Sequence, residues 1–326
     1  MYFNPSNLMT LKIGNISPLL TARTLKGNWG TLLLPVASDD TIDFYKLADE
    51  IDYLIDSGID GIYSNGTAGE FYNQNEQEFD LIQEILAEKC HQSAIPFQIG
   101  ASHPGPVICL ERIKRTVALR PSAFQVILPD WVITTMSEKL NFLKKLAEKA
   151  EGIPLVLYNP PHAKDILTPA DYGLLIREIP QLIGIKVAGG DMSWYRDMGI
   201  YSTEIAIFVP GHLLASGVKN KVAAGAYSNV ACLSPGGSQR WWELIQADIN
   251  AALSVQDRIL KFFEECITPY KEKGYSNPAL DKFLAAIGGW CDIGTRLRWP
   301  YKWISEDDVA SARIKAVQYL PEFFKH

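Results

Sequence analysis

The chain has 326 residues, of which 47% are hydrophobic and 21% charged, a composition typical of a soluble globular protein. Its formal net charge of -6 argues against a nucleic-acid-binding surface, which needs a basic patch. No apolar run approaches the ~20 residues that a membrane span needs, and the N-terminal residues do not have the pattern of a secretory signal. The five cysteines are widely spaced, which is typical of reduced thiols. We therefore expect a cytoplasmic protein that contacts neither nucleic acid nor a membrane.

After a polar first stretch, short apolar segments alternate with longer segments of helical periodicity. The predicted strands lie at 30–36, 61–66, 95–101, 123–129, 153–161, 182–188, 205–211 and 224–230. Strict alternation predicts parallel strands, in an open sheet or a closed barrel. Because eight units are present and no G-x-G-x-x-G follows the first strand, the pattern favours a (β/α)8 TIM barrel.

From about residue 246 onward the pattern is helical only. We predict three amphipathic helices within 254–274, 278–289 and 305–325. The sequence thus predicts an N-terminal extension at 1–28, the barrel at 29–245, and a C-terminal helical region at 246–326 that packs on the barrel.

Lys186 is the most informative residue of the predicted strand ends, where barrels of this type place their catalytic side chains. It lies between apolar residues and is followed by the small residues of AGG. A partly desolvated amine has a lowered pKa and is a nucleophile for a ketone, with which it forms a Schiff base. The alternative is a lysine that extends its ammonium to solvent past a buried stem.

A Schiff-base lysine needs a proton shuttle and a site for the anion of its substrate. Tyr158 ends the fifth strand and is the candidate shuttle, although a tyrosine there is also an ordinary core residue. In the NGTAGE turn, the backbone N–H groups of Gly66, Thr67 and Ala68 could converge on a carboxylate, or the glycines could simply serve a tight turn. The Thr67 hydroxyl could link Tyr158 to the substrate.

Several motifs resemble the dihydrodipicolinate synthase and N-acetylneuraminate lyase family of class I aldolases. They are GTAGE at 66–70, YNPP at 158–161, GIK at 184–186, GAYSN at 225–229 and the tail that begins NPALDKF at 277. The resemblance runs from about residue 30 to 310 and implies a (β/α)8 barrel with three C-terminal helices in a homo-oligomer, a dimer or tetramer. It also implies a pyruvate-type 2-oxo acid bound to Lys186, with Tyr158 as acid/base group, Thr67 in its relay, and the Thr67–Ala68 backbone on the carboxylate.

Three positions depart from the family pattern. Ala68 replaces a second hydroxyl in the turn, a loss that a carboxylate held by backbone N–H groups tolerates. Asp130 and Trp131 stand where dihydrodipicolinate synthases have a tyrosine pair, and an indole cannot shuttle a proton as a phenol does. Ala163 falls about where those synthases carry an arginine for the aldehyde's carboxylate, and Lys164 is a poorer substitute. The sequence therefore argues against dihydrodipicolinate synthase activity.

Trp131, His162, His212 and Tyr227 are predicted to line the rest of the mouth and to bind substrate. His212 falls where sugar-acid lyases of the family place a substrate-contacting group, although it could equally begin the next helix. We expect no metal, because no third ligand accompanies the histidines, and no cofactor besides the Schiff base on Lys186. Glu70 is interpreted as a structural acceptor beneath the turn.

The leading hypothesis is a class I aldolase or lyase that makes or breaks a carbon–carbon bond next to pyruvate, on a sugar acid or related 2-oxo acid. A 2-keto-3-deoxy acid dehydratase would start from the same intermediate. The rival of a different class is a catalytically silent protein that binds a 2-oxo acid.

Overall fold

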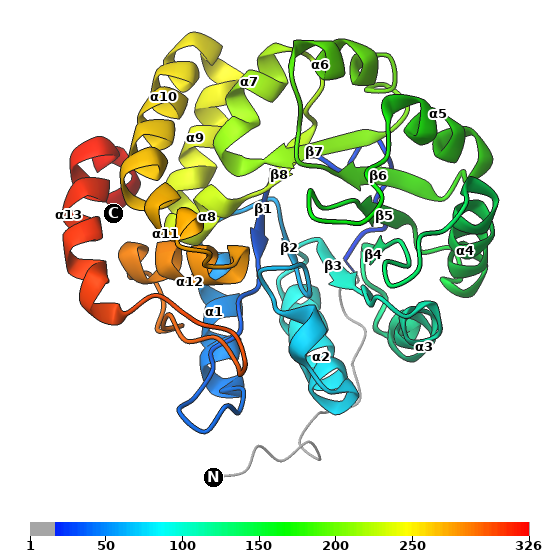
Figure 1. Cartoon of the computed structure of the whole chain (residues 1–326), viewed down its shortest axis with the longest axis horizontal. Coiled ribbons are helices and arrows are strands. Elements are labelled where there is room, and N and C mark those ends of the chain that lie inside the picture. Colours follow the sequence, from blue (N-terminus) through cyan, green and yellow to red (C-terminus); the bar gives the residue numbers. More distant parts are fainter. Residues whose placement is uncertain (1–16, 326) are drawn as a thin grey trace.

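The computed structural model describes residues 17–325, and its centre is a closed barrel of eight parallel strands (Figure 1). Each strand pairs with the next along the chain, and the eighth pairs with the first. The strands are β1 Gly27–Thr31, β2 Gly61–Tyr63, β3 Phe97–Gly100, β4 Ala123–Ile127, β5 Leu155–Tyr158, β6 Leu182–Lys186, β7 Ala206–Pro210 and β8 Gly225–Tyr227. The predicted (β/α)8 barrel is confirmed.

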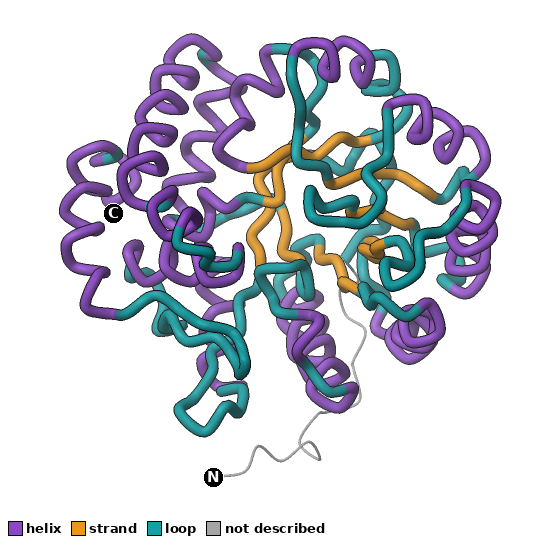
Figure 2. Tube along the Cα trace, viewed as in Figure 1, coloured by secondary structure: helices purple, strands orange, loops and turns teal. Residues whose placement is uncertain are grey.

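Helices surround the strands on the outside of the barrel (Figure 2). They are α1 Phe44–Asp56, α2 Glu76–Gln92, α3 Pro106–Thr116, α4 Met136–Lys149, α5 Pro169–Glu178, α6 Met192–Gly199, α7 Leu214–Lys219, α8 Asn229–Leu233 and α9 Pro235–Ala247. Helices α2, α4 and α5 each begin with a capping box, in which the side chain of the N-cap residue and that of the third helical residue satisfy each other's backbone N–H groups.

The first strand lies earlier in the chain than predicted. The sequence placed it at 30–36, whereas β1 spans Gly27–Thr31. The Leu32 N–H still donates to the Tyr63 carbonyl of β2 at 2.9 Å, but the buried run then leaves the strand ladder, and the Leu33 N–H donates to the Glu50 carboxylate at 2.8 Å. The prediction failed because a run of leucines indicates burial and does not show whether the neighbours are strands or side chains.

The C-terminal region consists of α10 Ile249–Cys266, α11 Thr268–Glu272, α12 Asn277–Gly288 and α13 Val309–Tyr319, all on one side of the barrel (Figure 1). The helix predicted over 254–274 is two helices. Pro269 lacks a backbone N–H, so the helix cannot continue through it, and α11 starts again at Thr268. Helix α12 packs on α8, which directly follows β8, and thereby reaches the carboxyl end of the barrel.

Side chains fill the barrel interior, and the largest of them are Trp29, Tyr63, Phe208 and Tyr227. Leu20 and Leu25 belong to the same buried cluster and come from the predicted N-terminal extension, of which residues 1–16 lie outside the described part. No helix among residues 17–325 is both long and apolar enough to cross a membrane.

Candidate active site

Lys186 ends β6 and lies beside Tyr158 on β5, its register partner, so the two side chains belong to one layer at the carboxyl end of the barrel. The lysine amine donates a hydrogen bond to the Tyr63 phenol at 3.1 Å. Aromatic rings surround the amine: its nitrogen lies 4.2 Å from the ring centre of Tyr158, 4.6 Å from that of Tyr63 and 5.3 Å from that of Tyr227. The predicted lysine therefore faces the barrel interior.

Burial lowers the pKa of Lys186 from its ordinary value of 10.5 to about 8, because a charged amine is poorly solvated there. The negative charge of Asp281 opposes this shift but does not cancel it. No carboxylate within residues 17–325 lies within salt-bridge distance of the half-buried Lys186 amine, whereas the fully buried Lys282 pairs with Glu70 at 2.6 Å. A substantial fraction of Lys186 is consequently a neutral nucleophile near pH 8.

Tyr158 and Thr67 form the hydroxyl pair that the sequence predicted. Their oxygens lie 3.3 Å apart, and either hydroxyl can donate. Burial raises the pKa of Tyr158, while the hydrogen bond with Thr67 opposes the rise. The phenol is therefore protonated at neutral pH, and it is connected to a second hydroxyl through which a proton can pass.

The turn after β2 leaves the backbone N–H groups of Gly66, Thr67 and Ala68 without an acceptor among residues 17–325. The Gly69 N–H donates to the Gly66 carbonyl and the Glu70 N–H to the Thr67 carbonyl, both at 3.1 Å. The N–H groups of Thr67 and Ala68 donate to no other group in the described chain, and both residues line the cavity next to Lys186. Gly66 is required because a Cβ there would lie 2.6 Å from the Tyr63 ring. Adjacent free amides of this kind suit a carboxylate.

Glu70 fixes the turn to the C-terminal helices, as its interpretation as a structural acceptor predicted. Its carboxylate accepts from the Lys282 amine on α12 at 2.6 Å and from the Arg298 N–H at 3.3 Å. Both Lys282 and Glu70 are almost completely buried. The ion pair holds α12 against the GTAGE turn, so this helix forms a wall of the site.

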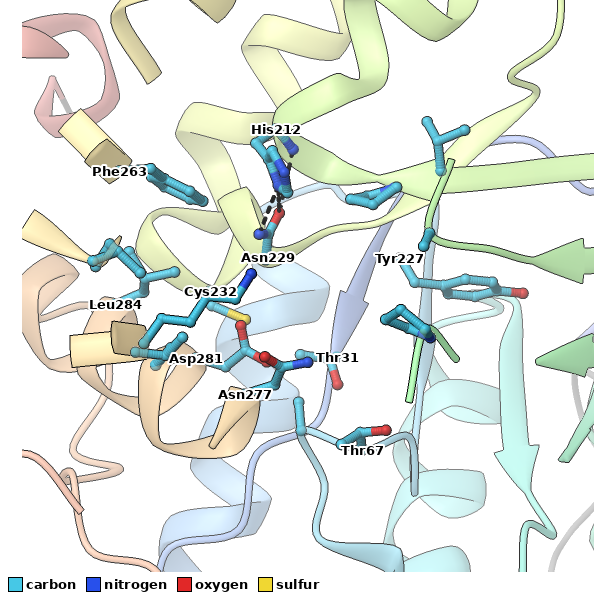
Figure 3. Close-up of a pocket in the computed structure, with 18 of the residues that line it drawn as sticks. Thr31, Thr67, His212, Tyr227, Asn229, Cys232, Phe263, Asn277, Asp281 and Leu284 are labelled. Carbon is cyan, nitrogen blue, oxygen red and sulfur yellow. Dashed lines mark hydrogen bonds between the residues drawn. The ribbon is translucent and has the colours of Figure 1, made fainter. Parts of the chain in front are cut away.

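A cavity of about 560 Å³ opens at this end of the barrel (Figure 3). Lys186, Tyr158, Thr67, Ala68, His212 and Tyr227 all line it, which brings together six of the nine predicted site residues. Helices α10, α11 and α12 complete the wall with residues that include Phe263, Lys271 and Asp281. The volume is in the range of small-molecule sites.

His212 and Asn229 occupy one side of this cavity (Figure 3). His212 lies in a single turn of 3-10 helix after β7, at the start of the next helical segment. It also lines the cavity, so the two predicted positions do not exclude each other. The Asn229 amide donates to its Nδ1 at 2.9 Å. Burial lowers the pKa of His212, and this imidazole is neutral at pH 7.

Two predicted mouth residues lie elsewhere. Trp131 is 82% exposed and does not line the cavity around Lys186. His162 lines a smaller cavity of about 210 Å³, which shares Tyr158 and Thr67 with the larger one. The Lys164 amine donates to the Trp131 carbonyl at 2.9 Å and lines neither cavity. Both loops follow the predicted strands, but only Pro161 of these loops lines the cavity around Lys186.

Sequence reasoning missed two residues of the site. Tyr63 is the last residue of β2 and accepts a hydrogen bond from the Lys186 amine. The sequence prediction assigned a role only to the turn that follows it. Asp281 lies on α12 and lines the cavity, although no rule about strand ends applies to it. The available signal was the adjacent pair Asp281 and Lys282 in the otherwise apolar run PALDKFLAA. Among residues 17–325, no group of three or more His, Cys, Asp or Glu side chains is placed to hold a metal ion.

The chain is a parallel (β/α)8 barrel with a half-buried lysine at the end of β6. The family model of the dihydrodipicolinate synthetase family matches residues 24–316. The chain belongs to this family, and its enzyme class is that of the lyases. One relative is the 4-hydroxy-tetrahydrodipicolinate synthase of Cytophaga hutchinsonii, which is 24% identical over 84% of this chain and 90% of its own length.

Solved structures agree with the fold. YagE, a prophage protein of E. coli K12 solved in complex with pyruvate, matches with a TM-score of 0.79 and 20% identity over 90% of this chain and 98% of its own. The N-acetylneuraminate lyase of Fusobacterium nucleatum matches with a TM-score of 0.78 and 20% identity over 91% of this chain and 99% of its own. At this identity the two structures support the barrel and its C-terminal helices alone.

Proposed function

We propose that the chain is a class I aldolase or lyase that binds pyruvate or another 2-oxo acid as a Schiff base on Lys186. The observation that carries this proposal is the amine itself: it is buried at the end of β6, has no ion-pair partner among residues 17–325, and titrates at about 8. Such an amine is a nucleophile under mild conditions, and the two free N–H groups of Thr67 and Ala68 line the same cavity.

The chemistry follows from this arrangement. The Lys186 amine attacks C2 of the 2-oxo acid, and a proton passes through Tyr158 and Thr67 to the former carbonyl oxygen, which leaves as water. The resulting iminium accepts the electron pair of a broken bond at C3. The Tyr158 phenolate, left after the phenol has given up its proton, takes a proton from C3 and gives an enamine that can attack an aldehyde. The reverse reaction cleaves the C3–C4 bond and releases the aldehyde. No metal or other cofactor takes part in these steps.

A sugar acid or a related hydroxylated 2-oxo acid is the substrate class that we propose. The relative from Cytophaga carries the name of a dihydrodipicolinate synthase, but two features of this chain argue against transferring that activity. Ala163 has no charge, and Lys164 is held by the Trp131 carbonyl outside the cavity. No cation therefore stands after β5 to bind a second carboxylate.

Exchange of the pyruvate methyl protons for deuterium tests the proposal, because it requires both the Schiff base and the enamine. The protein is incubated with pyruvate in D2O and the methyl signal is followed by proton NMR. We expect exchange that depends on wild-type protein and is lost in Lys186→Met. Background exchange with the wild type would contradict the proposed chemistry, and a screen of aldehydes with pyruvate then identifies the condensation partner.

We also propose that the chain assembles as a homo-oligomer, a dimer or tetramer. Trp131, Val132 and Ile133 support this, because they place three consecutive large apolar side chains on the surface after β4, each more than half exposed. Light scattering after size-exclusion chromatography measures the mass directly, and a mass of 36.3 kDa at micromolar concentration would contradict the proposal.

A further inference from the structure

Asp281 is the one carboxylate on the inner wall of the large cavity, since the other lining carboxylate, Glu264, is exposed on α10. The Asp281 carboxylate accepts no hydrogen bond and makes no ion pair within residues 17–325. It lies on α12, and Figure 3 places it beside Thr31, Cys232 and Asn277. The chemistry on Lys186 described above does not use it.

A partly buried carboxylate without partners is costly, because the charged form loses its hydration. Burial raises the pKa of Asp281 to about 7, and attraction to Lys186 opposes the rise. Asp281 is not needed to hold α12 in place, because the neighbouring Lys282 already binds α12 to the GTAGE turn through Glu70. A group of this kind is more easily explained by a ligand that supplies the missing hydrogen bonds.

The position of Asp281 says which part of a ligand it would meet. Asn277 lies one helical turn earlier on α12, on the same face of the helix as Asp281. It also lines the cavity and is exposed, so polar side chains of α12 extend from Asp281 to the rim of the cavity. A pyruvate unit fills only part of a cavity of about 560 Å³, and α12 forms part of the wall that is left for the rest of a longer ligand. A chain that continues beyond C3 therefore has Asp281 available as a hydrogen-bonding partner.

We propose that Asp281 is a specificity-determining residue that binds a hydroxyl group on the substrate chain beyond C3. This inference rests on the proposed function and narrows it to hydroxylated 2-oxo acids. A carboxyl group near its own pKa can either accept a hydrogen bond from a hydroxyl or donate one to it. When ionised, the same group repels a second carboxylate.

Two six-carbon acids provide the test. 2-Keto-3-deoxygluconate carries hydroxyls on C4, C5 and C6, and 2-oxohexanoate carries none. For each acid we measure the concentration at which borohydride trapping on the protein is half-maximal, and we count adducts of the intact acid and of released pyruvate together. Part of the sugar acid is cyclic and has no free ketone, but this part is the same for every protein. It therefore cancels when the ratio of the two concentrations is compared between wild type and variant. Pyruvate alone serves as the reference ligand.

In the wild type we expect tighter binding of the hydroxylated acid. In Asp281→Leu, the half-maximal concentration of the hydroxylated acid should rise about tenfold or more relative to that of 2-oxohexanoate, because a hydrogen bond to a charged group is lost. Asp281→Asn keeps a hydrogen-bonding side chain and should change the ratio less. Glu272→Gln, which removes an exposed carboxylate of α11 outside the cavity, is the matched control and should leave the ratio unchanged.

A change in the ratio below about threefold in Asp281→Leu, with pyruvate trapping intact, would overturn the role of Asp281 and leave the Schiff-base function standing. If Asp281→Leu no longer traps pyruvate, the same threshold applies to Asp281→Ala, which adds no bulk. Failure of the wild type to trap pyruvate would overturn the proposed function and this inference together.

Discussion

Replacing Lys186 with methionine should stabilise the folded protein at pH 7. A lysine whose pKa is lowered from 10.5 to about 8 carries an ionisation cost of about 3 kcal/mol at neutral pH. Methionine has a similar length and no charge, and it removes this cost. Because Asp281 loses its only attractive charge in the variant and must then be protonated, we expect a net gain of about 2 kcal/mol.

The pH dependence gives the sharper test. The unfolded lysine binds its proton more tightly than the folded one, so the cost is fully present below pH 8 and fades as pH rises towards 10.5. Urea unfolding of both proteins at pH 7 and pH 10, followed by circular dichroism, should show a stability difference that shrinks by most of its value at the higher pH.

Lys282→Met is the matched control, because it removes a fully buried lysine close to the site that, unlike Lys186, is paired with a carboxylate, that of Glu70. Breaking this ion pair leaves an uncompensated buried carboxylate and should destabilise the protein by about 3 to 5 kcal/mol. The reasoning would be refuted if Lys186→Met were no more stable than the wild type at pH 7, or if the two lysine variants changed stability in the same direction.

Three further results are expected. Tyr158→Phe should slow deuterium exchange into pyruvate by about 10²- to 10⁴-fold while borohydride trapping stays measurable, and unchanged exchange would remove Tyr158 from the proton relay. Thr67→Val should slow exchange by about tenfold and Thr67→Ser should restore it, because only the hydroxyl 3.3 Å from the phenol matters; equal rates would exclude the relay. Trapping of pyruvate should rise as pH increases through about 8, the pKa of Lys186. In Asp281→Asn the rise should occur at lower pH, because the negative charge that raises the pKa of Lys186 is gone. A midpoint that stays or moves upward would contradict this coupling.

The barrel could be predicted from the sequence because its signal is periodic and repeated eight times. Single boundaries were less certain, and β1 begins three residues earlier than expected. Leu32 and Leu34 are buried in a cluster that includes α1, and Leu33 in a cluster with the C-terminal helices, and hydrophobicity does not distinguish such burial from that of a strand. The break between α10 and α11 was visible as Pro269, but the amphipathic pattern on either side concealed it.

The site was predictable where its residues end strands, as Lys186 and Tyr158 do, since the barrel topology alone brings strand ends together. Loop residues were not: Trp131 and His162 follow the correct strands, but the path of a loop depends on its own contacts, such as the Lys164 amine on the Trp131 carbonyl. Asp281 was missed because the packing of α12 on the barrel is a long-range contact that no local pattern encodes.

Mapping of a reduced pyruvate adduct tests the central claim most directly. The wild-type protein is incubated with pyruvate, reduced with borohydride, digested and analysed by mass spectrometry, with Lys282→Arg as a control for modification of the second buried lysine. We predict a single adduct on the peptide that contains Lys186, absent in Lys186→Met and retained in Lys282→Arg. The absence of an adduct in the wild type, or its persistence in Lys186→Met, would contradict the account.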